Sequence, residues 1–567
     1  MAEKRTATPG PSTTLQRGKA CLRCRKRKMK CDGAKPACQQ CVRAKKSEAC
    51  EYDDGKGKTR TQLMREHIQQ LELRIKELES TDYRHSPSVT LFDPHAPSPY
   101  LSESSSSSSH DSPGGFSLST SASPVPFSLV FRPGGTSLRA SPDAVRVNLP
   151  LNHFLAHRHQ CGFELHAGRL RESLHLPLTE RRHPVLMNAI FLWACYLSRP
   201  NPLSQHEDLY LTRALASISD AAKHSSKVID LIQASCLLSL YFLSNACLPE
   251  GSYHAGAAAS LALQWGLHQI GSPEVTPPSA MMSDWDRPFT LDPPKDSIEQ
   301  GERILTFWQV YDLDRCWSVA LQRPAMLPDS KHPKTTITTP WPQRMEEYEA
   351  GEVDWGRSGQ PTISAFFMHQ AQATTLVGGF STAALRVKAS SLLEGANKLS
   401  SSWNPRLSPT NNFMDNFRAF EATIARFTTT LLPLHQLAAT MPDDKYTLYM
   451  IHSLSQTAVI RLHHPFIADN QMSREKSLLA ARAVTLVTKH ITEPDFEYLD
   501  PLLGHCWVSA ARVFVFELVQ RQSAWPPVDV ADIRGELSTL LFALVKLGTR
   551  YPLLGQYSIQ SLCMTPS

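Results

Sequence analysis

The chain has 567 residues, of which 41% are hydrophobic and 20% are charged, and its formal net charge is +6. This length corresponds to roughly three to four domain-sized units, or to one large domain with appendages. The charge is unevenly divided, because residues 1–80 carry +10 and the remaining 487 residues carry −4. A basic head on a slightly acidic body indicates a polyanionic partner for the head.

The first 20 residues are polar and basic, unlike the apolar core of a signal peptide. The most apolar stretch, 231–248, is interrupted by polar residues, so it predicts a buried helix and no membrane partner is expected. We therefore expect neither secretion nor a disulfide framework. In a reducing compartment the 13 cysteines are core thiols, metal ligands or catalytic groups.

After an N-terminal stretch, 1–17, that we expect to be disordered, six cysteines fall within 18–52 with the spacing C-x2-C-x6-C-x6-C-x2-C-x8-C. They are Cys21, Cys24, Cys31, Cys38, Cys41 and Cys50. The spacing is a duplicated half-motif, and a C-x2-C turn lets two thiolates hold one soft cation. Six thiolates complete two four-coordinate zinc sites if two of them bridge, and Cys21 and Cys38 open the two halves. We therefore predict two zinc ions per chain.

Two segments resemble the fungal binuclear zinc cluster transcription factors. They are ACLRCRKRKMKC (20–31) and KPACQQC (35–41), and in the second Pro36 lies shortly before the fourth cysteine. The alternative interpretation is an unrelated structural zinc knot. The resemblance implies a DNA-binding domain over 18–52 and a partner that is double-stranded DNA.

Five of the six residues between Cys24 and Cys31 are cationic, and we expect them on a short helix held at both ends by thiolates. The resemblance implies that Lys28 reads a G-rich triplet in the major groove, with Arg27 as the second base contact. The other cations are predicted to contact phosphates or to neighbour the zinc cluster: Arg25, Lys26, Lys30, Arg43, Lys45 and Lys46.

A linker over 53–62 precedes a heptad seam over 63–80. The seam places Met64, Leu71 and Leu78 at d positions and Ile68 and Ile75 at a positions, a pattern that favours a parallel two-stranded coiled coil. We predict a homodimer, with a heterodimer as an open alternative. The other interpretation of the seam is an amphipathic helix that packs on its own domain.

Residues 81–146 contain 18 Ser and 9 Pro and predict a disordered spacer. The body, 147–567, has ten long stretches with helical periodicity and almost no strand signal, so the predicted fold class is all-α. It resembles the middle homology region of the same regulators, through GSYHAGAA (251–258), ERILTFWQVYDLD (302–314), LQRPAMLP (321–328) and RLHHPF (461–466). The resemblance implies a regulatory domain.

We predict a nuclear, zinc-dependent regulator of RNA polymerase II genes that reads CGG-like triplets as a dimer and contacts coactivators or the transcription machinery. Two alternatives are a protein-interaction regulator whose zinc module does not read DNA, and an all-α enzyme with a zinc knot. No serine elbow, dinucleotide loop or paired-carboxylate motif occurs, so the enzyme is disfavoured.

Overall fold

The computed structural model describes residues 20–45, 47, 50, 142–177, 179–271, 289–328, 332–355, 361–368, 379–405, 412–523, 525 and 529–555. Every regular element in these ranges is a helix, so the predicted all-α class is confirmed. The chain divides into two compact units, Met1–Phe131 and Arg132–Ser567. The predicted linker, the heptad seam, Lys46 and nearly all of the serine-rich spacer lie outside the described residues.

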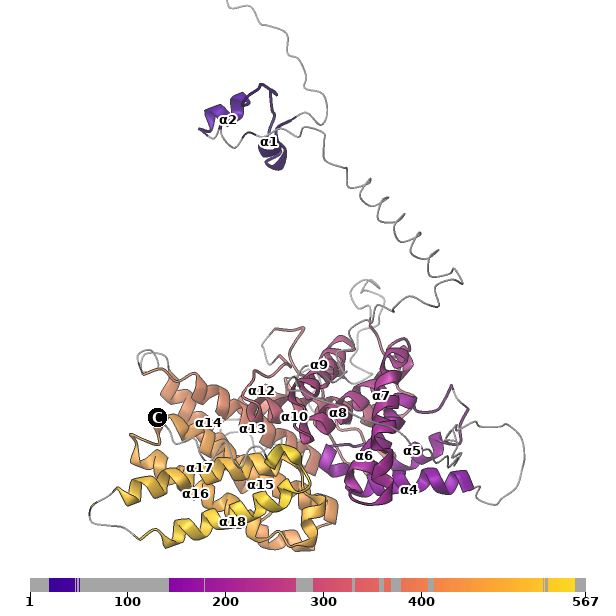
Figure 1. Cartoon of the computed structure of the whole chain (residues 1–567), viewed down its shortest axis with the longest axis vertical. Helices are drawn as coiled ribbons and strands as arrows, with labels where there is room; N and C mark the ends of the chain where they lie inside the picture. Colours follow the sequence, from indigo (N-terminus) through magenta and orange to yellow (C-terminus); the bar gives the residue numbers. More distant parts are fainter. Residues whose placement is uncertain are drawn as a thin grey trace, which may run out of the picture. The chain divides into compact units, whose positions relative to one another are not determined.

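The described residues of the first unit form two five-residue helices, α1 (Leu22–Lys26) and α2 (Gln39–Arg43), and the loop that joins them (Figure 1). Its buried residues are cysteines rather than aliphatic side chains. So small an apolar interior cannot hold a fold by the hydrophobic effect alone, and the metal chemistry of the thiols has to contribute.

The second unit is a helical body with one continuous hydrophobic core. Its helices are α4 (Pro142–His157), α5 (Ala167–Ser173), α6 (Pro184–Leu197), α7 (Glu207–Ala221), α8 (Val228–Ser244), α9 (Leu248–Gln264), α10 (Ser297–Ala320), α11 (Met345–Glu349), α12 (Thr362–Met368), α13 (Thr382–Ser401), α14 (Phe413–Thr429), α15 (Pro442–His463), α16 (Gln471–Lys489), α17 (Leu502–Gln522) and α18 (Ala531–Gly548).

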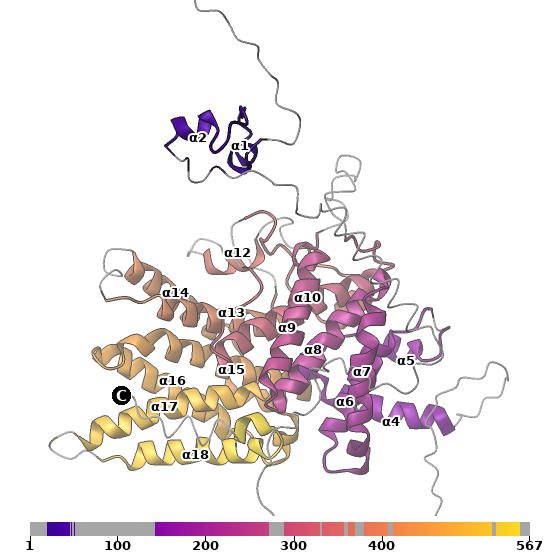
Figure 2. The ribbon, with the colours of Figure 1, turned by 45° about the horizontal axis from the view of Figure 1, so that its top comes forward.

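Neighbours in the chain are often neighbours in space, as for α6 with α7, α8 with α9, and α16, α17 and α18 with one another. Figures 1 and 2 show α16–α18 side by side at one end of this unit and α6–α8 at the other. Helix α10 packs on α8 and α9 on one side and on α13 on the other. It is therefore the element that joins the two halves of the body.

Helix α10 is buried on all faces from Gln300 to Ala320. A helix that is surrounded by other elements has to satisfy its charged side chains internally. Glu302 pairs with Arg182, and Asp312 pairs with Arg386 of α13 at 2.8 Å. The stretch 302–314, which carried part of the family resemblance, is thus a central structural helix.

Helices α4, α5, α11, α12 and α13 were not predicted as long periodic stretches, and α4 begins at Pro142, ahead of the expected domain boundary at 147. The reason is clear for α13, whose buried face contains Arg386, Lys388, Ser390 and Ser391. Polar residues on the core side hide the apolar periodicity on which the prediction rested.

Two helical segments are long and apolar enough to cross a membrane, Ser225–Ser244 and Leu502–Gln522. In the structure, 83% of the first apolar window and 67% of the second are buried inside the body. Both segments are therefore core helices of the body. Ser225–Ser244 contains most of the stretch 231–248, which the sequence predicted to be a buried helix.

Candidate metal centre

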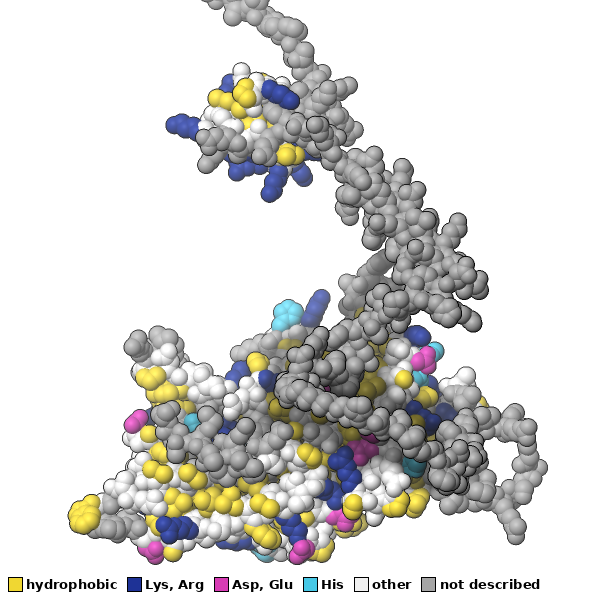
Figure 3. Space-filling model, in the orientation of Figure 1, with side chains coloured by type: hydrophobic (Ala, Val, Ile, Leu, Met, Phe, Trp, Pro, Cys, Tyr) yellow, Lys and Arg dark blue, Asp and Glu magenta, His cyan; other side chains and the backbone are white. Residues whose placement is uncertain are grey.

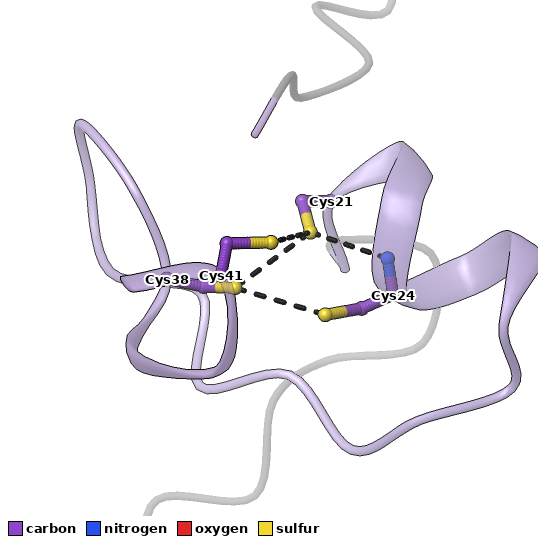
Figure 4. Close-up of side chains that lie close together, drawn as sticks. All are labelled: Cys21, Cys24, Cys38 and Cys41. Carbon is purple, nitrogen blue, oxygen red and sulfur yellow. Dashed lines mark hydrogen bonds between the residues drawn. The ribbon is translucent and has the colours of Figure 1, made fainter. Parts of the chain in front are cut away.

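Four cysteine side chains converge between the two short helices. Cys21, Cys24, Cys38 and Cys41 are buried, and their sulfurs all lie within 4.8 Å of one another. The Sγ of Cys21 is 3.8 Å from that of Cys38 and 3.9 Å from that of Cys41, and the Sγ atoms of Cys24 and Cys38 are 3.7 Å apart. Figure 4 shows the four side chains directed at one another.

The two helices present these sulfurs in the same way. Cys21 is the N-cap of α1 (φ −60°, ψ 149°) and Cys38 is the N-cap of α2 (φ −68°, ψ 151°). Cys24 and Cys41 each occupy the third helical position, one turn further on. The duplicated half-motif of the sequence therefore corresponds to a duplicated local structure.

The other two cysteines lie beside this group. The Sγ of Cys50 accepts a 3.2 Å hydrogen bond from the backbone N–H of Cys38. Cys31 and Asp32 place their ligand atoms within 4.8 Å of the sulfur of Cys38 and of each other. The Asp32 carboxylate also accepts from the backbone N–H of Gln39 at 3.0 Å, so it ties the connecting loop to the start of α2. Asp32 is a positioning residue that the spacing argument missed.

The chemistry of this donor set fits zinc. Four sulfurs placed about 2.3 Å from one zinc ion at the corners of a tetrahedron lie about 3.8 Å apart, close to the separations found here. Burial raises the pKa of Cys21, Cys24, Cys38 and Cys41, so the free thiols would hold their protons at neutral pH. A bound cation would displace those protons, and metal binding and folding would then be coupled.

The basic residues of the first unit face solvent. Arg25, Lys26, Arg27, Lys28 and Lys30 are all exposed, as are Arg43 and Lys45 in the second half. Figure 3 shows Lys and Arg side chains projecting from the surface of the first unit. None of these side chains is buried, so their charges are accessible from solvent.

We expected the residues between Cys24 and Cys31 to form one short helix, and this prediction is wrong in the length of the helix. Helix α1 ends at Lys26, and Lys28 adopts the left-handed conformation with φ 53°. The N–H of Met29 closes the helix end by donating to the carbonyl of Cys24 at 2.9 Å. Lys45 repeats this conformation with φ 50°. It lies seven residues after Cys38, just as Lys28 lies seven residues after Cys21. Left-handed turns favour glycine or asparagine, so two lysines gave no sequence signal for them.

Two family models match the chain. The model described as fungal Zn(2)-Cys(6) binuclear cluster domain matches residues 19–59, and the model described as fungal specific transcription factor domain matches residues 154–343.

The relatives found by sequence comparison are named as transcriptional activators or transcription factors. The citrinin biosynthesis transcriptional activators mrl3 of Monascus ruber and ctnR of Monascus purpureus are each 26% identical over 389 residues. The match covers 65% of this chain, 70% of mrl3 and 62% of ctnR. Transcription factor FBD3 of Gibberella moniliformis is 33% identical over 79 residues, 14% of this chain and 10% of that protein. No solved structure matches the chain.

The resemblance inferred from the cysteine spacing is thereby confirmed. The chain matches the models of both domains that these fungal transcription factors combine, the binuclear zinc cluster domain and the fungal specific transcription factor domain. It is a fungal transcription regulator with a zinc-binding, DNA-binding domain, and this class of protein is not a class of enzymes.

Proposed function

We propose that this protein is a sequence-specific regulator that reads a GC-rich, CGG-like triplet in the DNA major groove as a dimer. The observation that carries the proposal is the pair of matching cysteine turns, which hold an exposed basic run on a metal-binding scaffold. A solvated charge run has no fixed shape, whereas this run begins in a helix anchored by Cys21 and Cys24. A fixed array of donors is what base-edge recognition requires.

All six cysteines, Cys21, Cys24, Cys31, Cys38, Cys41 and Cys50, are proposed to bind two zinc ions, with Cys21 and Cys38 shared between them. The structure supports this assignment because Cys38 lies close to cysteines of both half-motifs. Its sulfur lies near those of Cys21 and Cys24, and its backbone N–H contacts the sulfur of Cys50. The zinc ions would supply the cross-links that so small an interior lacks.

Lys28 is proposed as the base-reading residue, with Arg27 beside it, and the remaining cations of the two halves as phosphate contacts. The exposure of Lys28 and its place at a fixed left-handed turn support this role. Its ammonium group would donate to guanine O6 or N7. The seam over 63–80 would pair two chains, and the linker over 53–62 would set the spacing of two half-sites.

The helical body over 147–567 is proposed to regulate the DNA-bound protein in the nucleus and to contact coactivators or the transcription machinery. Since two relatives are named as activators, we propose activation of the target genes. The second candidate, a zinc module that binds proteins without reading DNA, makes a different prediction about sequence preference.

The decisive experiment selects bound sequences from a random pool of duplexes with full-length protein, and compares Lys28→Ala with Arg43→Ala. We expect the wild type to select paired GC-rich triplets. Lys28→Ala should weaken binding to the selected site by about 1–3 kcal/mol and relax the preference at one base. Arg43→Ala, the matched loss of a phosphate contact, should weaken binding to all sequences alike.

An unchanged preference in Lys28→Ala would contradict its reading role. Binding that depends steeply on salt but shows no preference for any sequence would favour the second candidate.

A further inference from the structure

A pocket in the helical body lies where three helices begin. It has a volume of about 560 Å³ and is formed by the N-terminal ends of α5, α13 and α15, by α11 and by one side of α10. Apolar side chains form part of its wall, among them Leu305, Trp308 and Val387. We call this cavity the Glu164 pocket, after a residue of the loop that precedes α5.

The charged groups of this pocket are mostly acidic. Six carboxylates line it against three guanidinium groups. Each guanidinium already has a carboxylate partner: Arg386 with Asp312 at 2.8 Å, Arg158 with Asp443 at 3.2 Å and Arg344 with Asp444 at 3.7 Å. A fourth carboxylate, that of Glu349, lies 2.7 Å from Nε2 of His166. Glu164 and Glu346 are left without an ion pair among the described residues.

Glu164 is the more unusual of the two. Its carboxylate has no hydrogen bond within the described ranges, yet neither oxygen is sealed from solvent, because the unpartnered side-chain atoms that lack accessible surface all belong to other residues. Burial raises the pKa of this carboxyl to about 7; Arg158 opposes the rise, whereas Asp443, Glu346 and Asp444 add to it. All four of these charged residues line the same pocket. The Glu164 carboxylate therefore faces the cavity and is accessible to a ligand there.

Helix dipoles are the alternative explanation, since acidic side chains near the N-terminal ends of helices are favourable. This explanation covers the acidic residues in the first turns of α11 and α15. It does not cover Glu164, because the N-cap of α5 is His166, whose Nδ1 accepts from the backbone N–H of Arg169 at 2.9 Å. A partly buried carboxylate that accepts no hydrogen bond costs stability, so its retention needs another reason.

We propose that the Glu164 pocket binds a small organic cation, an amine or a guanidine with an apolar group, and that Glu164 is its principal acceptor. A cation would form charge-assisted hydrogen bonds with this carboxylate, and the surplus of acidic groups favours a cation over an anion. The apolar group would lie against Leu305, Trp308 and Val387. The volume is within the usual range for small-molecule sites, roughly 300–1,000 Å³. The inference concerns the helical body and does not depend on DNA recognition by the zinc cluster.

Calorimetric titration of the full-length protein with phenethylamine and with agmatine tests the site. Phenethyl alcohol is the uncharged counterpart, and potassium chloride at matched ionic strength controls for screening. We expect saturable binding of at least one of the two cations, no binding of the alcohol, and a loss of affinity of at least about ten-fold in Glu164→Gln. The matched control is Glu172→Gln, which removes an exposed carboxylate of α5 outside the pocket and should leave the affinity unchanged.

Three outcomes of these titrations would overturn the proposal. They are the absence of saturable binding by both cations, equal affinity in Glu164→Gln, and equal affinity for the alcohol. Titration with calcium chloride adds a fourth, because saturable binding of calcium without binding of either organic cation would assign the carboxylates to a metal ion.

The pH dependence of binding identifies the acceptor. Because burial raises the pKa of Glu164 to about 7, about a tenth of this carboxyl is ionised at pH 6 and about nine tenths at pH 8. The affinity of the wild type for the cation should therefore rise about ten-fold between these values. His159 and His166 also line the pocket, so Glu164→Gln is measured in parallel, and the rise should be lost in this variant. The same rise in both proteins would overturn the role of Glu164.

A last measurement separates a ligand-binding role from a structural one. Without added cation at pH 8, Glu164→Gln should have a Tm equal to or above that of the wild type, because it removes a charge that has no partner among the described residues. A Tm several degrees lower would show that Glu164 supports the fold, and would overturn its assignment to a ligand.

Discussion

The sharing of thiolates between two zinc ions can be tested by comparing the loss of Cys38 with the loss of Cys24. Six thiolates give eight zinc–sulfur bonds if Cys21 and Cys38 each contribute to both sites. Cys38 lies between the halves, with its sulfur 3.8 Å from that of Cys21 and 3.7 Å from that of Cys24. Cys38→Ala would then remove one ligand from each zinc ion, whereas Cys24→Ala would remove a ligand from only one.

The expected magnitudes follow from the strength of structural zinc sites. A site worth about 10–16 kcal/mol through four ligands loses about 3 kcal/mol with each bond, or about 100-fold in affinity. In Cys38→Ala both ions should be weakened by this factor. In Cys24→Ala one complete site should survive.

The assay is the zinc content of purified full-length protein after dialysis against a competing chelator. We expect two zinc ions per chain in the wild type, one in Cys24→Ala and fewer than one in Cys38→Ala. A Cys38→Ala protein that keeps as much zinc as Cys24→Ala would refute the shared-thiolate arrangement, and so would a wild type with one zinc ion. DNA binding should follow zinc content, since the basic run begins in the helix that the cluster anchors.

Two further predictions concern the helical body. Arg386→Gln leaves the buried carboxylates of Asp312 and Asp500 without their shared cation and should lower the free energy of unfolding by about 3–5 kcal/mol in urea titrations. Burial raises the pKa of the Asp500 carboxyl, and loss of the Arg386 cation would raise it further. The loss of stability caused by Arg386→Gln should therefore be smaller at pH 5 than at pH 8, because protonation removes the unpaired buried charge. A loss of stability that does not change with pH would contradict the ion-pair assignment. Gly301→Ala should cost about 1–3 kcal/mol by thermal unfolding, because the added Cβ would lie 2.4 Å from the ring of Tyr348, and a combined Tyr348→Leu change should recover part of the loss.

The sequence was sufficient for the helices that bury an apolar face. Each of the ten predicted stretches corresponds to a helix, from α6 to α18, with ends that differ by up to eight residues. Helix α13 escaped prediction because Arg386 and Lys388 lie on its buried side. Arg386 is stable there only through carboxylates 74 and 114 residues distant in sequence. No local pattern can report a compensation of that kind.

The cysteine cluster was predictable for a different reason. Metal ligands have to occur as particular residue types at short, repeated spacings, so the sequence itself displays the site. What it does not display is the backbone path between ligands. The left-handed turn at Lys28 lies between Cys24 and Cys31, and lysine gives no indication of it. The same applies to Asp32, whose capping role depends on a contact with α2.

The cations of the two units differ in what their retention implies. Those beside the cysteines are exposed, so their charges stay in contact with water, and their number alone is weak evidence for a partner. Their significance comes from the scaffold that fixes them. Arg323 presents the reverse case, because it is one residue in a slightly acidic body, and charge composition gives no hint of it. Its unpaired guanidinium nitrogens are nevertheless a stronger physical signal, since a buried guanidinium without acceptors is destabilising. Net charge therefore located the nucleic-acid-directed head, whereas only an inventory of hydrogen bonds identified Arg323 in the body.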